Sequence, residues 1–288
     1  MQRSARRAAG ARGASECVAE SLRRAIAEAL DPIGAPGGPS PVGAHEARRW
    51  LKRARAALRL MRPALGDRAF ADEDALLRSC ARSMAGMRDA DVLLETLAGL
   101  RQRFPCARSI DELAPLERLI RARREAAATK PAAATRSARL LRASQKRLRL
   151  PMRRPTSVSS LEQAMRAIYR RGRNAYASAC ATSTAAALHR LRKHAKYFAN
   201  AVDALGDAAT KRQGKRARLA IRIGDWLGEH HDLAMLERAV RESGDALSPA
   251  ARRSLRALVA KRQRLLRRRA FRAGGRLYAA KARRVAAL

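Results

Sequence analysis

Apolar residues recur three or four positions apart along most of the chain, which is the spacing of one face of an α-helix. In residues 45–61 this spacing gathers the apolar side chains on one side of the predicted helix, namely Ala47, Trp50, Leu51, Ala54, Ala57, Leu58 and Met61. The opposite side gathers the basic side chains His45, Arg48, Arg49, Lys52, Arg53, Arg55 and Arg59, with the carboxylate of Glu46 at its edge. Like charges one turn apart repel one another. A basic face with so little acid therefore indicates that an anion binds along it.

The same arrangement returns in residues 189–202, half the chain later, which indicates an internal repeat. One face there carries His189, Arg192, Lys193, Lys196 and Asn200, and the other carries Leu191, Ala195, Phe198 and Val202. A second matching pair is GMRDADVLLETL at 86–97 and GEHHDLAMLERAV at 228–240, which aligns His231 with Arg88 and Asp232 with Asp89. The two offsets differ by one residue, so we expect a duplication with a small insertion or deletion.

Helical spacing also predicts the helices that surround these pairs. The predicted helices cover 16–30, 45–61, 72–85, 86–100, 116–128, 132–150, 161–179, 189–205, 211–227, 228–240 and two stretches within 248–288. Proline and glycine separate them, because Pro32 stops the first helix, 34–43 is a loop rich in both residues, and Gly274 and Gly275 lie near the last bend.

No segment shows the alternating β-branched pattern of a strand, so the sequence predicts an all-α fold. We expect a single domain over 15–288, built from two tandem pseudo-symmetric helical-bundle halves, 15–150 and 161–288. The residues between them, 151–160, contain prolines and hydroxyl side chains and form the expected linker.

Charge narrows the class of partner. The chain has 63 Lys and Arg against 25 Asp and Glu, a formal net charge of +38, while its hydrophobic fraction of 47% is that of a folded protein. So large a positive charge favours a polyanionic partner, which is nucleic acid, an anionic membrane or an inorganic phosphate polymer. Aromatic residues make up only 3% of the chain, which argues against the stacking platforms that grip single-stranded nucleic acid. A DNA binder that contacts the backbone alone stays open.

Two further features bear on the compartment. Cys17, Cys80, Cys106 and Cys180 form no C-x-x-C pair, so we interpret them as reduced thiols in a cytoplasmic protein without a zinc or redox motif. No apolar run approaches the length of a membrane span, so no membrane insertion is expected. The basic first 14 residues are interpreted as a frayed start rather than as a transit peptide.

Several motifs occur in an order that is similar to one known family. They are RDADVL at 88–93, YRRGR at 169–173, LGEHHDLAML at 227–236 and GRLYAAKARR at 275–284. Together with the paired basic helices they resemble the CHAD family over nearly the whole chain. The chain departs from the family pattern in its long loop before His45 and in Ala85, where a glycine is expected three residues before Arg88.

The resemblance implies two helical bundles with a basic groove or pore between them that binds inorganic polyphosphate, on polyphosphate granules in the cytoplasm. Some members are joined to a CYTH triphosphatase domain, and from its length we expect this chain to be the binding module alone, without enzymatic activity and without a cofactor. A homodimer stays open.

The candidate polyphosphate-binding residues extend beyond the two basic helix faces. A helix advances about 5 Å per turn, so the faces that begin at His45 and His189 can meet successive phosphates, and Arg can donate two N–H groups to phosphate oxygens. The other candidates are Arg88, Arg170, Arg171, Arg173, Lys211, Lys215, Arg218, Arg222 and His231. The histidines at 45, 189 and 231 should be neutral in the empty site and protonated when phosphate binds.

Two side chains near these candidates invite other interpretations. His194 falls at the edge of an apolar helix face, which is typical of a structural histidine. His230, His231 and Asp232 could instead ligate a metal in a phosphohydrolase, although strongly basic surroundings disfavour a divalent cation. Asp89, Asp91 and Asp232 are expected to orient neighbouring Arg and His side chains or to cap a helix.

Overall fold

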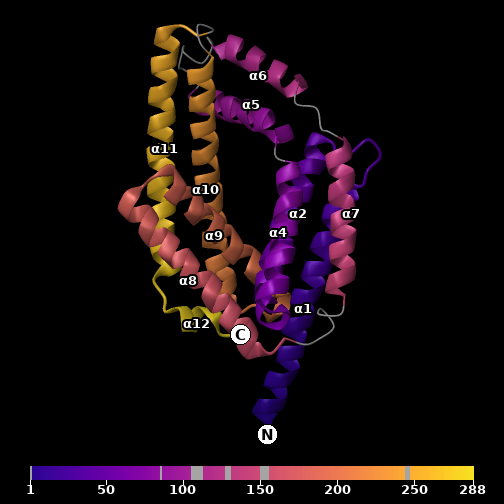
Figure 1. Cartoon of the computed structure of the whole chain (residues 1–288). Helices are drawn as coiled ribbons and strands as arrows, with labels where there is room; N and C mark the ends of the chain where they lie inside the picture. Colours follow the sequence, from indigo (N-terminus) through magenta and orange to yellow (C-terminus); the bar gives the residue numbers. More distant parts are fainter. Residues whose placement is uncertain (1, 85, 105–112, 127–130, 150–155, 244–246) are drawn as a thin grey trace.

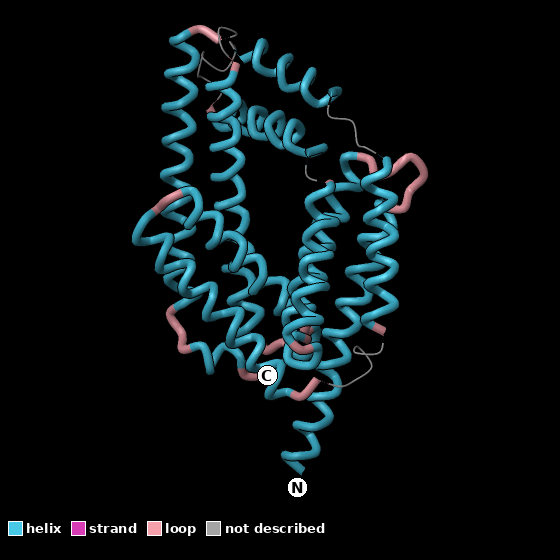
Figure 2. The backbone as a smooth tube through the Cα atoms, in the orientation of Figure 1, coloured by secondary structure: helices cyan, strands magenta, loops and turns pink. Residues whose placement is uncertain are grey.

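Helices form the regular structure of the chain wherever the computed structural model describes it, in residues 2–84, 86–104, 113–126, 131–149, 156–243 and 247–288 (Figures 1 and 2). The predicted all-α fold class is confirmed. The α-helices are α1 (Gln2–Ile33), α2 (Pro41–Leu60), α3 (Arg62–Leu65), α4 (Asp67–Ser83), α5 (Gly86–Arg103), α6 (Ala114–Ala126), α7 (Pro131–Leu148), α8 (Val158–Thr182), α9 (Ala185–Ala204), α10 (Lys211–Glu242), α11 (Pro249–Tyr278) and α12 (Ala282–Ala286). A short 3₁₀ turn, Gly206–Ala208, separates α9 from α10.

The larger core lies around α2, which packs against α1, α4 and α9. The apolar face predicted for this helix is inside, since Leu51, Ala54 and Leu58 are fully buried. The corresponding face of α9 is buried as well, with Leu191 and Phe198 completely inaccessible to solvent. Burial of a leucine or phenylalanine side chain contributes about 1.5 to 3 kcal/mol, so this packing fixes the rotation of both helices. Their basic faces are consequently directed away from the core.

The second core lies between helices that are far apart in the sequence. Residues of α5 and α6, such as Leu97 and Leu116, pack against Leu236 of α10 and Val259 of α11. In Figure 1, α5 and α6 accordingly lie beside the upper ends of α10 and α11, away from α1. Helix α5 packs on α10, and α2 packs on α9. These four helices therefore surround the space in which the candidate site lies.

Tyrosine and glycine join α8 to α11. The Tyr169 hydroxyl donates to the carbonyl oxygen of Leu277 at 3.0 Å. A Cβ atom on Gly172 would lie 2.6 Å from the Tyr278 hydroxyl oxygen, so glycine is required for this close approach. Two of the motifs that identified the family resemblance, YRRGR and GRLY, are therefore in direct contact, and their role here is to pack two helices together.

Several helix boundaries differ from the prediction. The first helix begins at Gln2 rather than at 16, and Pro32 lies in its last turn rather than after it. The loop expected over 34–43 is shorter, since α2 begins at Pro41, where the Ser40 hydroxyl accepts a hydrogen bond from the Gly43 amide at 3.1 Å. Capping at Ser40 thus adds a first turn ahead of His45.

Later boundaries differ for similar local reasons. One continuous helix, α10, replaces the two helices expected over 211–227 and 228–240. Gly274 lies near the last bend, as predicted, but still inside α11, which ends at Tyr278, and the Tyr176 ring packs where a side chain at Gly274 would be. Helix α4 begins at Asp67 rather than at 72, after Gly66 with a φ of 78°. Helix α8 already begins at Val158, within the stretch expected to be the linker.

Candidate anion-binding site

Two adjoining cavities lie where α2, α5, α9 and α10 meet. The large cavity has a volume of about 640 Å³, and the small cavity, which α4 also borders, has a volume of about 420 Å³. Both cavities are lined by the same six residues at their junction, which are Lys52, Val92, Arg192, Lys196, Asn200 and Asp232. Cations from α2 and α9, the two helices of the internal repeat, therefore meet at this junction.

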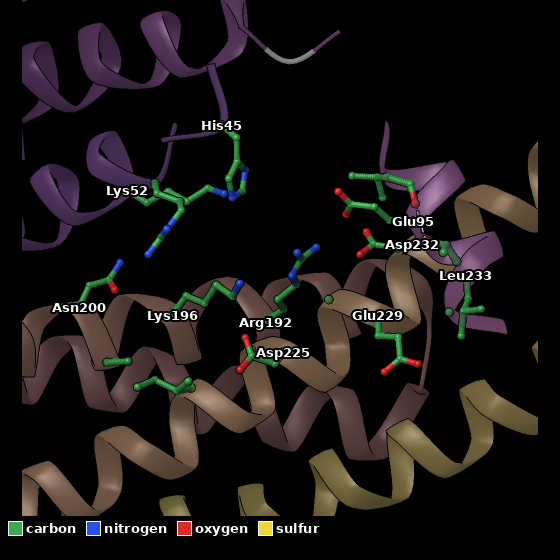
Figure 3. A pocket seen from close by; sticks show the side chains of 18 of the residues that line it. His45, Lys52, Glu95, Arg192, Lys196, Asn200, Asp225, Glu229, Asp232 and Leu233 are labelled. Carbon is green, nitrogen blue, oxygen red and sulfur yellow. Dashed lines mark hydrogen bonds between the residues drawn. The ribbon is translucent and has the colours of Figure 1, made fainter. Parts of the chain in front are cut away.

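The large cavity has a basic side and an acidic side. Its predicted cations are His45, Arg49, Lys52 and Arg53 of α2 with Arg192 and Lys196 of α9. Figure 3 shows His45 and Lys52 reaching into the cavity opposite Lys196 and Arg192. The acids are Glu95 of α5 and Asp225, Glu229 and Asp232 of α10. Sequence analysis did not place Glu95 at the site, because only the packing of α5 on α10 brings it there.

Glu229 is largely neutralised by an arginine from outside the cavity. Arg262 of α11 donates to both of its carboxylate oxygens, at 2.7 and 2.9 Å, and is itself only 8% exposed. Such two-point pairing is the strongest form of this contact. Asp225 and Glu95 are exposed to solvent. Repulsion between the acidic side of the large cavity and a bound anion therefore comes mainly from the three other acids that line it.

The small cavity is more strongly basic. Its lining includes the predicted residues Arg48, Lys52, Arg55, His189, Arg192, Lys193, Lys196 and His231. Helix α4 adds Arg78 and Arg82, which sequence analysis had not included. Their spacing of one turn on a predicted helix was the available signal, but nothing in the sequence showed that α4 would line the same cavity as α9. Asp232 is the acid among the described residues that line this cavity.

A buried carboxylate organises the arginines beside the small cavity. Asp74 of α4, whose side chain is 5% exposed, accepts hydrogen bonds from Arg55 at 2.9 and 3.2 Å and from Arg78 at 2.8 Å. Arg59 lies 3.0 Å away from the same carboxylate. Burial alone would raise the pKa of Asp74, but these arginines overcome it and lower the pKa to about 2. Three guanidinium groups thus share one negative charge, which leaves an excess of positive charge.

The same excess affects Lys193. Its pKa is lowered by burial and then by the neighbouring positive charges of Arg55, Arg59 and Arg78. A cation that is destabilised by other cations gains most when an anion arrives. The cations beside the small cavity therefore favour the arrival of an anion.

Two of the predicted histidines, His189 and His231, also lie at this cavity. The rings of His189 and His231 lie with their centroids 5.7 Å apart. Burial lowers the pKa of His189, and His231, Arg192, Lys193 and Lys52 lower it further through their positive charges. Burial also lowers the pKa of His194, to about 4, beside Lys193, Arg171 and Arg59. Both groups are therefore neutral near pH 7 in the empty protein.

Other predicted residues lie elsewhere. Arg59 stacks over the Tyr197 ring at 4.0 Å and, with Arg171, lines a separate cavity of about 480 Å³ between α3, α4 and α8. Arg170 and Arg173 are exposed on α8, on the sides that Tyr169 and Gly172 do not use for packing. The stripe of Lys211, Lys215, Arg218 and Arg222 is exposed on α10 and lines neither of the two adjoining cavities. The side chain of Arg88 lies outside the described residues.

Within the described parts of the chain, no group of three or more His, Cys, Asp or Glu side chains is arranged to hold a metal ion. His230, a member of the candidate metal motif, accepts a hydrogen bond from Gln263 through its backbone oxygen at 3.2 Å. Burial lowers the pKa of its side chain, and the positive charge of Arg267 lowers it further. His230 thus takes part in the packing of α10 on α11.

Comparison with known proteins assigns the family. The model of the CHAD domain matches residues 24–241, which is most of the chain. The chain belongs to the CHAD family. CHAD domains in general bind inorganic polyphosphate. No curated protein matches this CHAD chain.

Solved structures show the same fold. The crystal structure of the CHAD domain from the plant Ricinus communis is similar to this chain with a TM-score of 0.64 at 19% identity, over 91% of this chain and 92% of that one. PptA from Streptomyces chartreusis is similar with a TM-score of 0.63 at 17% identity, over 91% of this chain and 99% of that one. Among the described helices of this CHAD chain, none has the length and apolar character needed to cross a membrane.

Proposed function

We propose that this chain binds inorganic polyphosphate in the two adjoining cavities and acts as a non-enzymatic protein of cytoplasmic polyphosphate granules. The observation that carries the proposal is the cluster around Asp74, where Arg55, Arg59 and Arg78 share one carboxylate and Lys193 lies within their field. Membership of the CHAD family supports it at the level of the ligand class.

Polyphosphate suits these residues chemically. It carries a negative charge on every phosphate and presents no bases, so its receptor needs a series of cations and no groups that read a base edge. Lys52, Arg192 and Lys196 supply such a series at the junction of the cavities. Arg55 and Arg78 extend it into the small cavity and hold their geometry through Asp74. We assign Arg59 to positioning, since its guanidinium is engaged by Asp74 and the Tyr197 ring.

A competition titration tests the proposal. Labelled long-chain polyphosphate is bound to the purified protein at about 150 mM salt and challenged with duplex DNA at equal phosphate concentration. The cavity variant carries Ala at Arg48, Lys52, Arg192 and Lys196. We expect polyphosphate to withstand the DNA, and we expect the cavity variant to lose binding while its helical circular dichroism is retained.

A matched variant controls for net charge. It carries Ala at Lys211, Lys215, Arg218 and Arg222, so it loses the same number of positive charges from a surface outside both cavities. If binding is local to the cavities, this control keeps most of its affinity. Equal losses in the two variants, or easy displacement by DNA, would show that the charge acts diffusely and would favour the sequence-independent nucleic-acid binder instead.

A further inference from the structure

We propose that Gly224 and Gly228 of α10 are positioning residues of the anion site, which make room for the side chains of Lys196 and Arg192 and so direct these two cations to the junction of the cavities. This inference rests on the proposed polyphosphate binding for its functional meaning. Its structural part, that the glycines seat two cationic side chains, can be tested without any ligand.

The two helices match in spacing. Lys196 and Arg192 are one turn apart on α9, and Gly224 and Gly228 are one turn apart on α10, against which α9 packs. Both glycines are buried and line the large cavity. Figure 3 shows the Lys196 and Arg192 side chains where α9 and α10 run together, with their charged ends inside the cavity.

The distances show what fills the space above each glycine. A Cβ atom on Gly224 would lie 2.8 Å from Lys196 Cε and 2.9 Å from its Cγ, which is closer than carbon atoms approach one another. A Cβ atom on Gly228 would lie 3.2 Å from an Arg192 guanidinium nitrogen and 3.5 Å from its Cζ. The Lys196 stem and the Arg192 guanidinium thus lie directly on the α10 backbone.

Close packing of the two helix backbones is the competing explanation for glycines one turn apart. In that case the nearest atoms would belong to the backbone or the Cβ atoms of α9, whereas the nearest atoms are Cγ, Cδ and Cε of Lys196 and the guanidinium atoms of Arg192. Glycine is also a poor helix former, and α10 carries it twice in one turn beside the site. The need to make room for the two cationic side chains explains both the nearest atoms and the presence of two glycines in one turn.

The glycine also decides where the Lys196 charge lies. The neighbours of Lys196 on α9, Ala195 and Tyr197, are buried and fix the rotation of the helix. A side chain that can no longer lie on α10 must swing its ammonium group away from the junction. Substitution at Gly224 should therefore remove one cation from the site without changing the net charge of the protein.

Binding measurements form the first arm of the test. We expect Gly224→Ala to weaken long-chain polyphosphate binding by about tenfold, the loss of one charge-assisted contact. Gly228→Ala should have a smaller effect, since a guanidinium end group can shift by a few tenths of an ångström. The matched control is Gly214→Ala in the same helix, where the nearest atom, of Arg218, lies 4.0 Å away. We expect it to bind like the wild type, and an equal loss in this control would overturn the proposal.

A double-mutant cycle forms the second arm and needs no ligand. Gly224→Ala should lower the melting temperature of the wild type but leave it unchanged, or raise it, in a Lys196→Ala background, where the obstructing stem is gone and alanine is the better helix former. An equal fall in both backgrounds would show that the glycine serves backbone packing alone. If the wild type itself fails to bind polyphosphate, the proposed function is wrong. The double-mutant cycle still tests whether Gly224 makes room for the Lys196 side chain.

Discussion

The charge balance at Asp74 leads to a prediction about stability. Asp74 is nearly inaccessible to solvent, and its arginine partners lower its pKa from 3.8 to about 2. At about 1.36 kcal/mol per pKa unit, this difference stabilises the folded chain by about 2.5 kcal/mol when the carboxylate is ionised. We therefore expect Asp74→Asn to be less stable by roughly that amount at pH 7, which corresponds to a fall in melting temperature of roughly 5 to 10 °C.

The pH dependence has a definite sign. A carboxylate whose pKa is depressed by folding contributes its stabilisation above the pKa of the unfolded chain and loses it as the pH falls through the pKa of the folded state. The contribution of Asp74 should thus be complete above about pH 4 and decline toward about pH 2. The difference between the wild type and Asp74→Asn should shrink over the same interval.

Urea unfolding followed by circular dichroism between about pH 7 and pH 2.5 measures both quantities. The matched control is Asp67→Asn, since Asp67 also pairs with an arginine, Arg62 at 2.9 Å, but is exposed to solvent. Exposed ion pairs contribute little, so this control should unfold almost like the wild type. If Asp74→Asn were as stable as the wild type at pH 7, or if its deficit persisted undiminished at pH 2.5, the reasoning would be refuted.

Three further outcomes follow from the site and from the packing of α8. Polyphosphate should bind more tightly as the pH falls below about 6.5, because binding protonates His189, whose pKa is lowered in the protein without ligand. The affinities of the wild type at about pH 6 and pH 8 should therefore differ. The two affinities of the His189→Gln variant should be nearly equal. Glu95→Gln should strengthen binding in the same titration by removing an acid from the large cavity, and unchanged affinity would place the polymer outside that cavity. Gly172→Ala should lower the melting temperature, because the new Cβ atom would lie 2.6 Å from the Tyr278 hydroxyl oxygen. In the control Gly99→Ala the new Cβ atom meets no atom within 4 Å, so this variant should raise the melting temperature, since alanine is the better helix former.

Helical periodicity alone was enough to predict the all-α fold and the orientation of the two repeated helices. In the repeated segments of α2 and α9 the predicted apolar face lies on one side, so burial of Leu51 and Phe198 directs the opposite, basic face away from the core. The match between 45–61 and 189–202 then predicted that the two basic faces belong together. Local boundaries were harder, because a boundary such as the start of α2 depends on one side chain, the capping hydroxyl of Ser40.

Three properties of the site depended on contacts between distant segments. Sequence spacing assigned Arg55 and Arg59 equal roles on one basic face, whereas the packing of α4 against α2 brings Asp74 between them and turns Arg59 onto Tyr197. The packing of α5 against α10 placed Glu95 in the large cavity.

The amino-acid sequence by itself determined which residues of this CHAD chain are cationic, which helix face each occupies and that the pattern occurs twice, since all three depend on local periodicity. Only the tertiary structure decided which cations converge, which are neutralised and which side chains lie on Gly224 and Gly228. Those outcomes depend on how helices pack across more than a hundred residues of chain, as α5 does on α10, and no local pattern in the sequence predicts that packing.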